Sequence, residues 1–156
     1  MGVTQVSYEV EGWGTGELWW EDGRVVWHEL PHPSRVARTL GGGELVERLH
    51  EYFAGGDVTF DDVAVDLEHD TPVLERCAQA LREIPRGELV TYGELAALAG
   101  SPGAARAAGS FCARNRLGLF VPCHRVVAAG GLGSYGSYGL EYKRRLLRLE
   151  GALASV

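Results

Sequence analysis

The sequence predicts an α+β protein built from an antiparallel sheet with a helix, followed by a mainly helical part. Three observations support this fold class: an aromatic, β-branched start with a tight turn, helical spacing of apolar residues further on, and a division of charge. Residues 1–71 hold four Arg, no Lys and fifteen Asp or Glu, a formal charge of −11, whereas residues 72–156 carry +5. We therefore predict two domains, residues 1–70 and residues 71–156.

In the first domain, two runs rich in Val, Trp, Tyr and Thr, Val3–Val10 and Gly16–Leu30, predict strands. Glu21–Arg24 contains Asp-Gly between aromatic runs and predicts a hairpin turn. Apolar residues then recur at steps of three and four over Gly43–Phe53, which predicts a helix. Val58–Leu67 alternates imperfectly and predicts one more strand.

The second domain opens with a long predicted helix. Thr71 suits its N-cap and Pro72 its first position. Its apolar face consists of Val73, Leu74, Cys77, Leu81 and Ile84. We therefore interpret Cys77 as a core residue, and Pro85 as part of the break that ends this helix.

Two short predicted helices follow, Gly93–Ala99 and Ala104–Arg114, joined by the turn Gly100–Gly103. This spacing is typical of a helix-turn-helix. The second helix lacks side chains long enough to read base edges in a major groove, but its small residues permit close approach to DNA. These small residues are Ala104, Ala105, Ala107, Ala108 and Gly109. An Ala-rich helix that only packs against its neighbour remains an alternative.

Charge and cysteine content narrow the classes of function. The net charge of −6 hides a basic second half suited to phosphate contact, although an ordinary solvated face would have the same charge. No stretch approaches a membrane span, and Met1–Glu11 has no basic leader, so we expect a cytoplasmic protein, or a nuclear one in a eukaryote. The three cysteines have no metal-ligand spacing, and we expect reduced thiols, no metal and no cofactor.

Pro122–Val126 places a thiol, Cys123, next to an imidazole, His124. A cysteine of ordinary pKa is mostly protonated at neutral pH, so a nucleophilic cysteine needs a neighbouring base or cation. His124 is a candidate for that base. A buried thiol beside a surface histidine is the alternative, since neighbouring residues on a strand point to opposite faces.

Several ordered motifs around this pair closely resemble the O6-alkylguanine-DNA alkyltransferase family over about residues 72–151. They are Ala96–Ser110, the lone Asn115, Pro122–Val126 and Gly139–Gly151. The resemblance implies an RNase H-like α/β N-terminal domain and a winged-helix-like C-terminal domain carrying the helix-turn-helix. It also implies binding of double-stranded DNA through the minor groove, with no membrane partner and no cofactor, and we expect a monomer.

The resemblance further implies single-turnover DNA repair. Cys123 would attack the alkyl carbon on O6 of guanine, and on O4 of thymine, and keep it as a thioether. His124 would deprotonate Cys123 through a water molecule, and Glu150 would orient His124.

DNA contacts are implied in the same way. Tyr92 would crowd the phosphate beside the lesion and promote base flipping, and Arg106 would fill the gap left by the flipped base. The groove-facing helix would present Ala104, Ala105, Ala107 and Gly109. The lesion pocket and its support would comprise Asn115, Val126, Tyr135 and Ser137. Tyr138 departs from the family pattern, because it adds bulk where the pocket wall is usually glycine.

Three other functions remain as alternatives. A non-catalytic lesion-binding relative would flip alkylguanine without transfer, but such relatives commonly have tryptophan at the position of Cys123. A helix-turn-helix regulator would prefer a defined operator and transfer nothing. A cysteine hydrolase using Cys123, His124 and Glu150 would turn over repeatedly and would not need Arg106.

Overall fold

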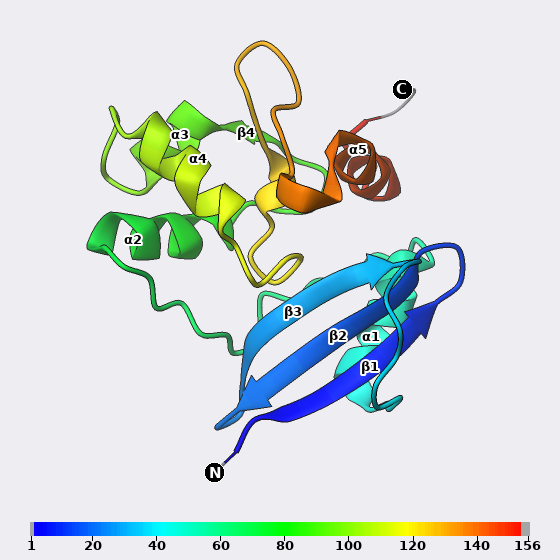
Figure 1. The fold of residues 1–156 in the computed structure, drawn as a ribbon. Coiled ribbons are helices and arrows are strands. Elements are labelled where there is room, and N and C mark those ends of the chain that lie inside the picture. Colours follow the sequence, from blue (N-terminus) through cyan, green and yellow to red (C-terminus); the bar gives the residue numbers. More distant parts are fainter. Residues whose placement is uncertain (1, 154–156) are drawn as a thin grey trace. The chain divides into compact units, whose positions relative to one another are not determined.

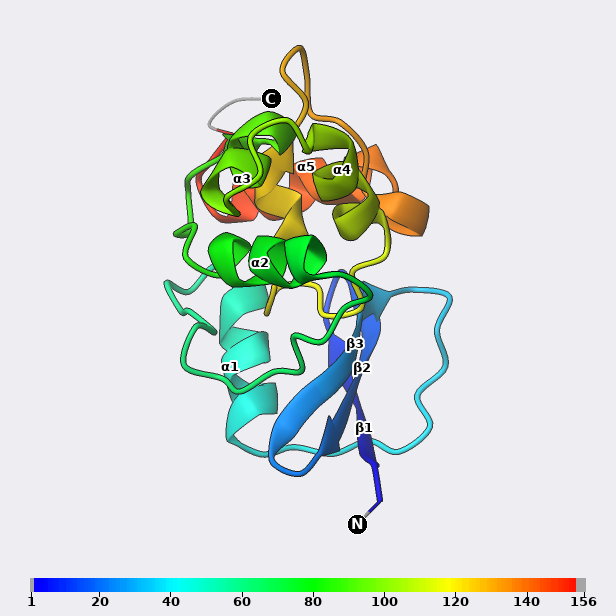
Figure 2. The same ribbon diagram turned by 90° about the vertical axis from the view of Figure 1, so that its left-hand side faces the viewer.

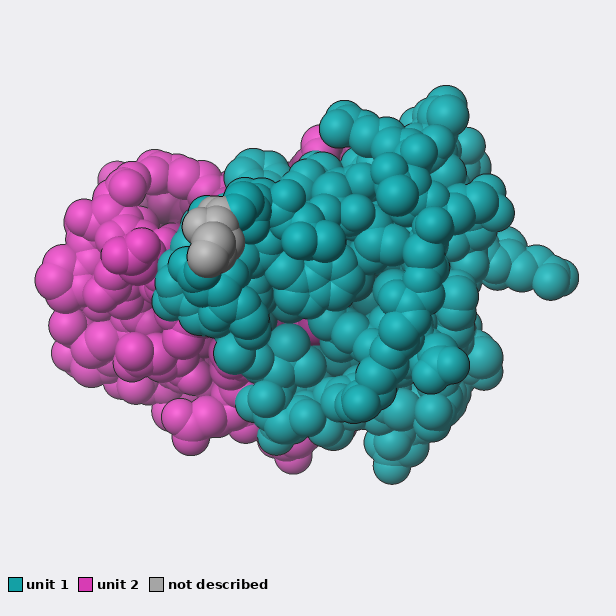
Figure 3. Space-filling model, turned by 90° about the horizontal axis from the view of Figure 1, so that it is seen from below, with its two compact units in different colours: residues 1–66, 116–118 teal, residues 67–115, 119–156 magenta. Residues whose placement is uncertain are grey.

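The computed structural model describes residues 2–153 and has an α+β fold. The chain forms two compact units, which Figure 3 colours separately. One unit contains residues 1–66 and 116–118, and the other contains residues 67–115 and 119–156. A short piece of the second half of the sequence thus belongs structurally to the first unit.

The first unit is built on an antiparallel sheet in the order β1-β2-β3 (Figure 1). Its strands are β1 (Thr4–Val10), β2 (Gly14–Glu21) and β3 (Arg24–His32). The predicted strands and hairpin are confirmed. At the β2–β3 turn Asp22 and Gly23 both have left-handed backbones, with φ of 54° and 78°, which this short Asp-Gly turn tolerates well.

Helix α1 (Glu44–Phe53) lies against one face of this sheet (Figure 2), as the spacing of its apolar residues predicted. Its inner side buries Val46, Leu49, Tyr52 and Phe53. The ring of Phe53 packs against Trp13 from the β1–β2 connection, with 4.9 Å between centroids. Packing of this apolar stripe, rather than helix propensity alone, holds so short a helix in place.

The predicted strand over Val58–Leu67 is wrong. The segment contains a turn and makes only one isolated parallel bridge, between Val65 and Val25. Two hydrogen bonds flank this bridge: Val25 N–H donates to Ala64 O, and Asp66 N–H to Val25 O, each over 3.0 Å. Phe60 and Val65 are buried, so the apolar pattern reflects separate anchors in the core rather than a ladder of strand pairs.

Residues 116–118 extend the first unit beside β3. Leu117 forms a parallel bridge with His28, whose N–H donates to Arg116 O over 2.8 Å. The ring of His28 adds a bond, in which Nδ1 donates to Gly118 O over 2.7 Å. Leu117 is 1% exposed. This segment is therefore fixed by backbone pairing, a buried side chain and a histidine contact.

The second unit is mainly helical and has four helices among its described residues; the first three confirm the helices predicted from the sequence, except that the first ends at Leu81, before Ile84. The four helices are α2 (Pro72–Leu81), α3 (Tyr92–Leu98), α4 (Ala105–Ala113) and α5 (Leu140–Leu149). The predicted N-cap of α2 is present, since the side chain of Thr71 accepts from Leu74 N over 3.3 Å. Thr91 caps α3 reciprocally with Glu94, and α3 packs against α4 as in a helix-turn-helix.

Two short strands and two 3₁₀ turns complete the second unit. They are β4 (Val90–Thr91), β5 (Val126–Val127), η1 (Cys123–Arg125) and η2 (Gly136–Tyr138). The strands β4 and β5 pair in parallel, so the chain just after Cys123 is hydrogen-bonded to the start of α3. No helix within residues 2–153 is long and apolar enough to cross a membrane.

Candidate active site

Cys123 lies in a locked stretch of backbone. It opens η1 directly after Pro122, and its N–H donates to Val121 O over 2.8 Å. Three residues later Val126 pairs with Val90 of β4. Cys123 is only 3% exposed. A thiol held this way has little freedom to move, so any group that contacts it must be brought to it.

His124 and Glu150 form a buried pair. His124 Nε2 lies 2.7 Å from Glu150 Oε2, and neither side chain is exposed. Burial lowers the pKa of His124, which outweighs the attraction of Glu150. Burial opposes ionisation of Glu150, but contacts with His124 and Arg125 hold the pKa of this carboxyl well below its usual range. The resting pair is therefore a neutral imidazole and a carboxylate.

The protonation of this pair fixes the tautomer of His124. Because the carboxylate can only accept, Nε2 must carry the ring proton and donate it to Glu150. Nδ1 then bears the lone pair, and it is buried without a hydrogen-bond partner among residues 2–153. The lone pair of this nitrogen is therefore available to accept a hydrogen bond inside the site.

Together with His124, Arg125 keeps Glu150 ionised. Its guanidinium donates to both carboxylate oxygens, from Nε over 2.9 Å and from Nη2 over 3.0 Å. A third bond runs from Nη1 to Ile84 O over 2.7 Å. This fork geometry is the strong form of an arginine–carboxylate pair, and it anchors the end of α5 to the turn that holds Cys123.

Lys143 on α5 is a site residue that sequence reasoning did not single out. It is fully buried, and its ammonium donates to Val126 O over 2.6 Å and to Ser134 O over 3.0 Å. Burial lowers its pKa. The ammonium thus joins the strand after Cys123 to the loop before η2. In the sequence Lys143 starts a basic run that is typical of an exposed surface, so no signal marked it.

Burial raises the pKa of Cys123 well above that of an ordinary thiol. The side chain of Cys112, on α4, raises this pKa further. The side chain of Asn115 and the charge of Lys143 act in the opposite direction and lower this pKa. The pKa shift of Cys123 therefore favours the protonated thiol, and a thiol in that form needs a base before it can act as a nucleophile.

An aromatic wall stands beside His124. The rings of Tyr135, Tyr138 and Tyr142 lie 5.0 to 6.3 Å apart between centroids. Tyr135 meets the imidazole of His124 edge-on at 6.5 Å, and burial raises the pKa of its hydroxyl well above the usual value. Ser137 in η2 is exposed, whereas Val126 is buried. The extra Tyr138 belongs to this wall.

Tyr92 opens α3 next to the loop before η2. Burial raises the pKa of its hydroxyl, which Ser134 partly offsets, and its ring centroid lies 6.0 Å from Lys143 Nζ. Gly133 has a left-handed backbone, and a Cβ there would come within 2.8 Å of the Tyr92 hydroxyl oxygen. A side chain at Gly133 is therefore excluded by both conformation and space.

The small residues of α4 lie on the accessible side of the helix. Arg106 and Ala105 are exposed, Ala104, Ala107 and Gly109 are partly exposed, and Ala108 and Phe111 are buried. At the end of this helix, Asn115 Nδ2 donates to Val121 O over 2.8 Å. The helix is thus tied to the backbone two residues before Cys123.

Residues 72–152 match the family described as 6-O-methylguanine DNA methyltransferase, DNA binding domain. The match covers more than half of the chain and contains every candidate site residue. The chain belongs to this family.

Full-length relatives of the family extend the likeness beyond that domain. The methylated-DNA–protein-cysteine methyltransferase of Methanopyrus kandleri is 47% identical over 79% of this chain and 89% of its own length. The enzyme of the same description from Mycobacterium tuberculosis is 45% identical over 76% of this chain and 72% of its own.

Solved structures show that the fold is shared as well. Mycobacterium tuberculosis O6-methylguanine methyltransferase superposes with a TM-score of 0.77 and 34% identity, over 98% of this chain and 96% of that one. Mycobacterium tuberculosis OGT in complex with DNA superposes with a TM-score of 0.78 and 35% identity, over 95% and 92%.

Within this methyltransferase chain, the second unit brings Cys123, His124, Glu150 and Tyr135 together and ties Asn115 and Tyr92 to their surroundings. Arg106 stands apart on the exposed side of α4.

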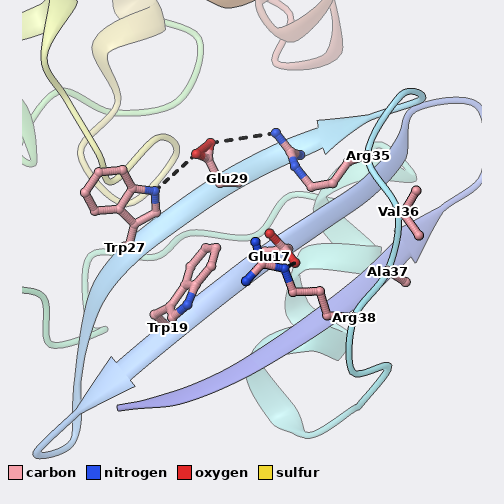
Figure 4. A pocket seen from close by; sticks show the side chains of 8 residues that line it. All are labelled: Glu17, Trp19, Trp27, Glu29, Arg35, Val36, Ala37 and Arg38. Carbon is pink, nitrogen blue, oxygen red and sulfur yellow. Dashed lines mark hydrogen bonds and ion pairs between the residues drawn. The ribbon is translucent and has the colours of Figure 1, made fainter.

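A separate hollow of about 650 Å³ lies on the first unit (Figure 4), where Glu29 accepts from Trp27 and pairs with Arg35. No candidate site residue lines that hollow. Sequence reasoning missed two residues that act on the pKa of Cys123, Lys143 and Cys112.

Proposed function

We propose that the protein repairs DNA by moving an alkyl group from O6 of guanine, and from O4 of thymine, to Cys123. Methyl transfer from DNA to a protein cysteine is the activity in the names of its relatives. The observation that carries the assignment of residues is the buried pair of His124 and Glu150, with the unpartnered Nδ1 of His124 next in sequence to a buried thiol.

In the proposed reaction His124 Nδ1 takes the proton of Cys123 through a bridging water. The thiolate sulfur then forms a bond to the alkyl carbon as the bond from carbon to O6 breaks, and the electron pair stays on guanine. Glu150 balances the imidazolium that results, because its carboxylate is already ionised and bonded to the ring. A thioether is not hydrolysed, so each protein reacts once.

DNA binding is assigned to α3 and α4, and a relative of this fold has been solved in complex with DNA. We place α4 in the minor groove with its small residues against the duplex, since open space surrounds Gly109 and the outer positions are accessible. Arg106 would enter the base stack in place of the flipped alkylguanine. Tyr92 would press on the neighbouring phosphate. The working form would be a monomer.

The finer description of the fold is also part of this proposal. We describe residues 1–70 as an RNase H-like domain and residues 71–156 as a winged-helix-like domain. The three-stranded sheet with α1 supports the first description. The helix-turn-helix of α3 and α4, with the short β4–β5 pair beside it, supports the second.

Intact mass measured after incubation with excess duplex DNA containing O6-methylguanine tests the proposal. We expect the addition of a single methylene unit that saturates at one per protein and maps to the peptide of Cys123. Cys123→Ala should show no addition but keep its affinity for the duplex. Cys77→Ser is the matched control, because Cys77 is a core thiol outside the proposed reaction.

Two outcomes would contradict the proposal. Modification at Cys112 or Cys77 would show that the nucleophile is wrongly assigned. An unchanged mass together with selective binding of the lesion would favour the non-catalytic relative, despite the presence of Cys123.

A further inference from the structure

Both oxygens of the buried Glu150 carboxylate are engaged in hydrogen bonds. Oε2 accepts from His124 Nε2 over 2.7 Å and from Arg125 Nη2 over 3.0 Å. Oε1 accepts from Arg125 Nε over 2.9 Å. A planar guanidinium that bonds to two carboxylate oxygens holds the carboxylate in one plane. The fork of Arg125 therefore fixes the position of the oxygen that faces His124.

Arg125 is itself held in place by two other segments. Its backbone N–H donates to Pro122 O over 3.0 Å, and its Nη1 donates to Ile84 O over 2.7 Å. The Arg125 side chain is largely buried. The guanidinium cannot turn out to solvent without giving up the bond to Ile84 as well as the fork. Its positive charge therefore stays beside Glu150.

Two further cations lie close to the pair of His124 and Glu150. Lys143 on α5 disfavours the protonated form of His124 through its charge. Arg86 donates from Nη2 to the carbonyl of the residue that precedes Glu150, over 2.9 Å. Arg125 differs from both, because it bonds to the carboxylate itself. Arg125 is therefore the cation that compensates the charge of Glu150 most directly.

Two other titratable groups beside the pair are uncharged at neutral pH. The ring of Tyr135 meets that of His124 edge-on at 6.5 Å, and burial raises the pKa of the Tyr135 hydroxyl well above the usual value. Burial likewise raises the pKa of Cys123, the residue before His124. Neither group offsets the charge of Glu150, so the balance of charge depends on the neighbouring cations.

We propose that Arg125 is a positioning residue for the proton transfer, whose fork on Glu150 keeps Nδ1 of His124 free to accept the proton of Cys123. Without this cation the buried carboxylate would carry an uncompensated charge, which is costly and favours uptake of a proton by the pair. If the imidazole took up that proton, it would bind at Nδ1, because Nε2 already carries one. If Glu150 took it up, the carboxyl would donate to Nε2, and the ring hydrogen would sit on Nδ1. The lone pair of Nδ1 is lost either way.

The test is the protonation of His124, followed through the NMR chemical shifts of its two ring nitrogens as the full chain is titrated from pH 9 to pH 5. In the wild type, Nδ1 should stay unprotonated until the pH falls below 6.5, because burial and the neighbouring cations lower the pKa of His124. In Arg125→Met the midpoint should rise by roughly one to three pH units, which is the usual effect of losing a bonded opposite charge. The ring of His28, in the first unit, is the internal reference and should titrate alike in both proteins.

The consequence for methyl transfer rests on the proposed function. At pH 6, transfer from duplex DNA containing O6-methylguanine should be several-fold slower in Arg125→Met than in the wild type. The difference should close towards pH 9, where the pair gives up the added proton. A merely structural role would slow transfer by the same factor at every pH. If the wild type accepts no methyl group, the proposed function fails, and the titration of His124 still decides the role of Arg125.

Two more variants complete the test. Arg148→Met is the matched control, because Arg148 lies on α5 but pairs with Glu141, and the His124 midpoint should not move. Arg125→Lys keeps the charge, but an ammonium cannot reproduce the fork together with the bond to Ile84, so its midpoint should lie between those of the wild type and Arg125→Met. Arg125→Lys decides the test if Arg125→Met does not fold. A His124 midpoint equal to that of the wild type in either variant of Arg125 would overturn the proposal.

Discussion

Mild acid should destabilise the first unit through His28. This ring is 3% exposed, its Nδ1 donates to Gly118 O over 2.7 Å, and its Nε2 accepts from the Tyr8 hydroxyl over 2.6 Å. Burial lowers the pKa of His28 from 6.5 to about 4. A second proton on the ring would also remove the acceptor of the Tyr8 hydroxyl.

The sign and size of the effect follow from that shift. Between pH 6.5 and 4 the unfolded chain binds a proton that the folded chain does not, so the free energy of unfolding falls as the pH falls. At about 1.4 kcal/mol per pH unit, the loss due to His28 is about 2 kcal/mol by pH 5 and about 3 kcal/mol by pH 4. Above pH 6.5 this contribution to stability is complete.

Urea unfolding at pH 7 and pH 5, followed by tryptophan fluorescence, measures the effect in the right place, because all four tryptophans precede residue 28. In His28→Gln the side-chain amide can still donate and accept but does not titrate. Between the two pH values we expect the wild type to lose about 2 kcal/mol more than this variant. His32→Gln, at a less buried histidine, controls for the exchange itself. Equal losses in wild type and His28→Gln would refute the reasoning.

Three further outcomes are expected. Arg106→Ala should slow repair of duplex DNA roughly tenfold or more relative to reaction with free O6-methylguanine, because only the duplex has a gap left by the flipped base. Equal losses on both substrates would contradict the role proposed for Arg106. Glu150→Gln should cost about 3–5 kcal/mol in chemical denaturation, since Arg125 would keep a largely buried charge without its partner, and a loss below about 1 kcal/mol would contradict this. Thr71→Ala should cost about 1 kcal/mol through the lost bond to Leu74 N, and an unchanged denaturation midpoint would count against the cap.

Local signals predicted most of the secondary structure. The Asp22-Gly23 turn and the Thr71-Pro72 helix start are decided by backbone preferences within a few residues, and both are confirmed. The prediction of a strand over Val58–Leu67 was wrong, because the alternation of apolar residues shows which side chains reach the core but not whether a partner strand is available. The two-residue pairing of β4 with β5 is too short to leave a pattern.

The candidate site was harder to predict from the sequence, because it is formed by contacts between residues that lie far apart along the chain. Cys123 and His124 stood out as neighbours in the sequence, but Glu150 was found only through the resemblance, because 26 positions separate it from His124 along the chain. Lys143 and Cys112 were missed for a physical reason. An amine in a basic run and a thiol on an Ala-rich helix are ordinary in a sequence, and only the fold reveals that both act on the pKa of Cys123.

The placement of residues 116–118 in the first unit makes the two halves of the chain topologically interdependent. The polypeptide leaves the second unit after Asn115, contributes three residues to the first, and returns four residues before Cys123. Cutting the chain between the halves would leave this segment in one fragment and its pairing strand in the other. Buried Leu117 would then face solvent and His28 would lose its carbonyl partner. Exchanging one half for that of a relative would accordingly require matching the β3 edge to the inserted tripeptide, which constrains domain shuffling and the design of split reporters.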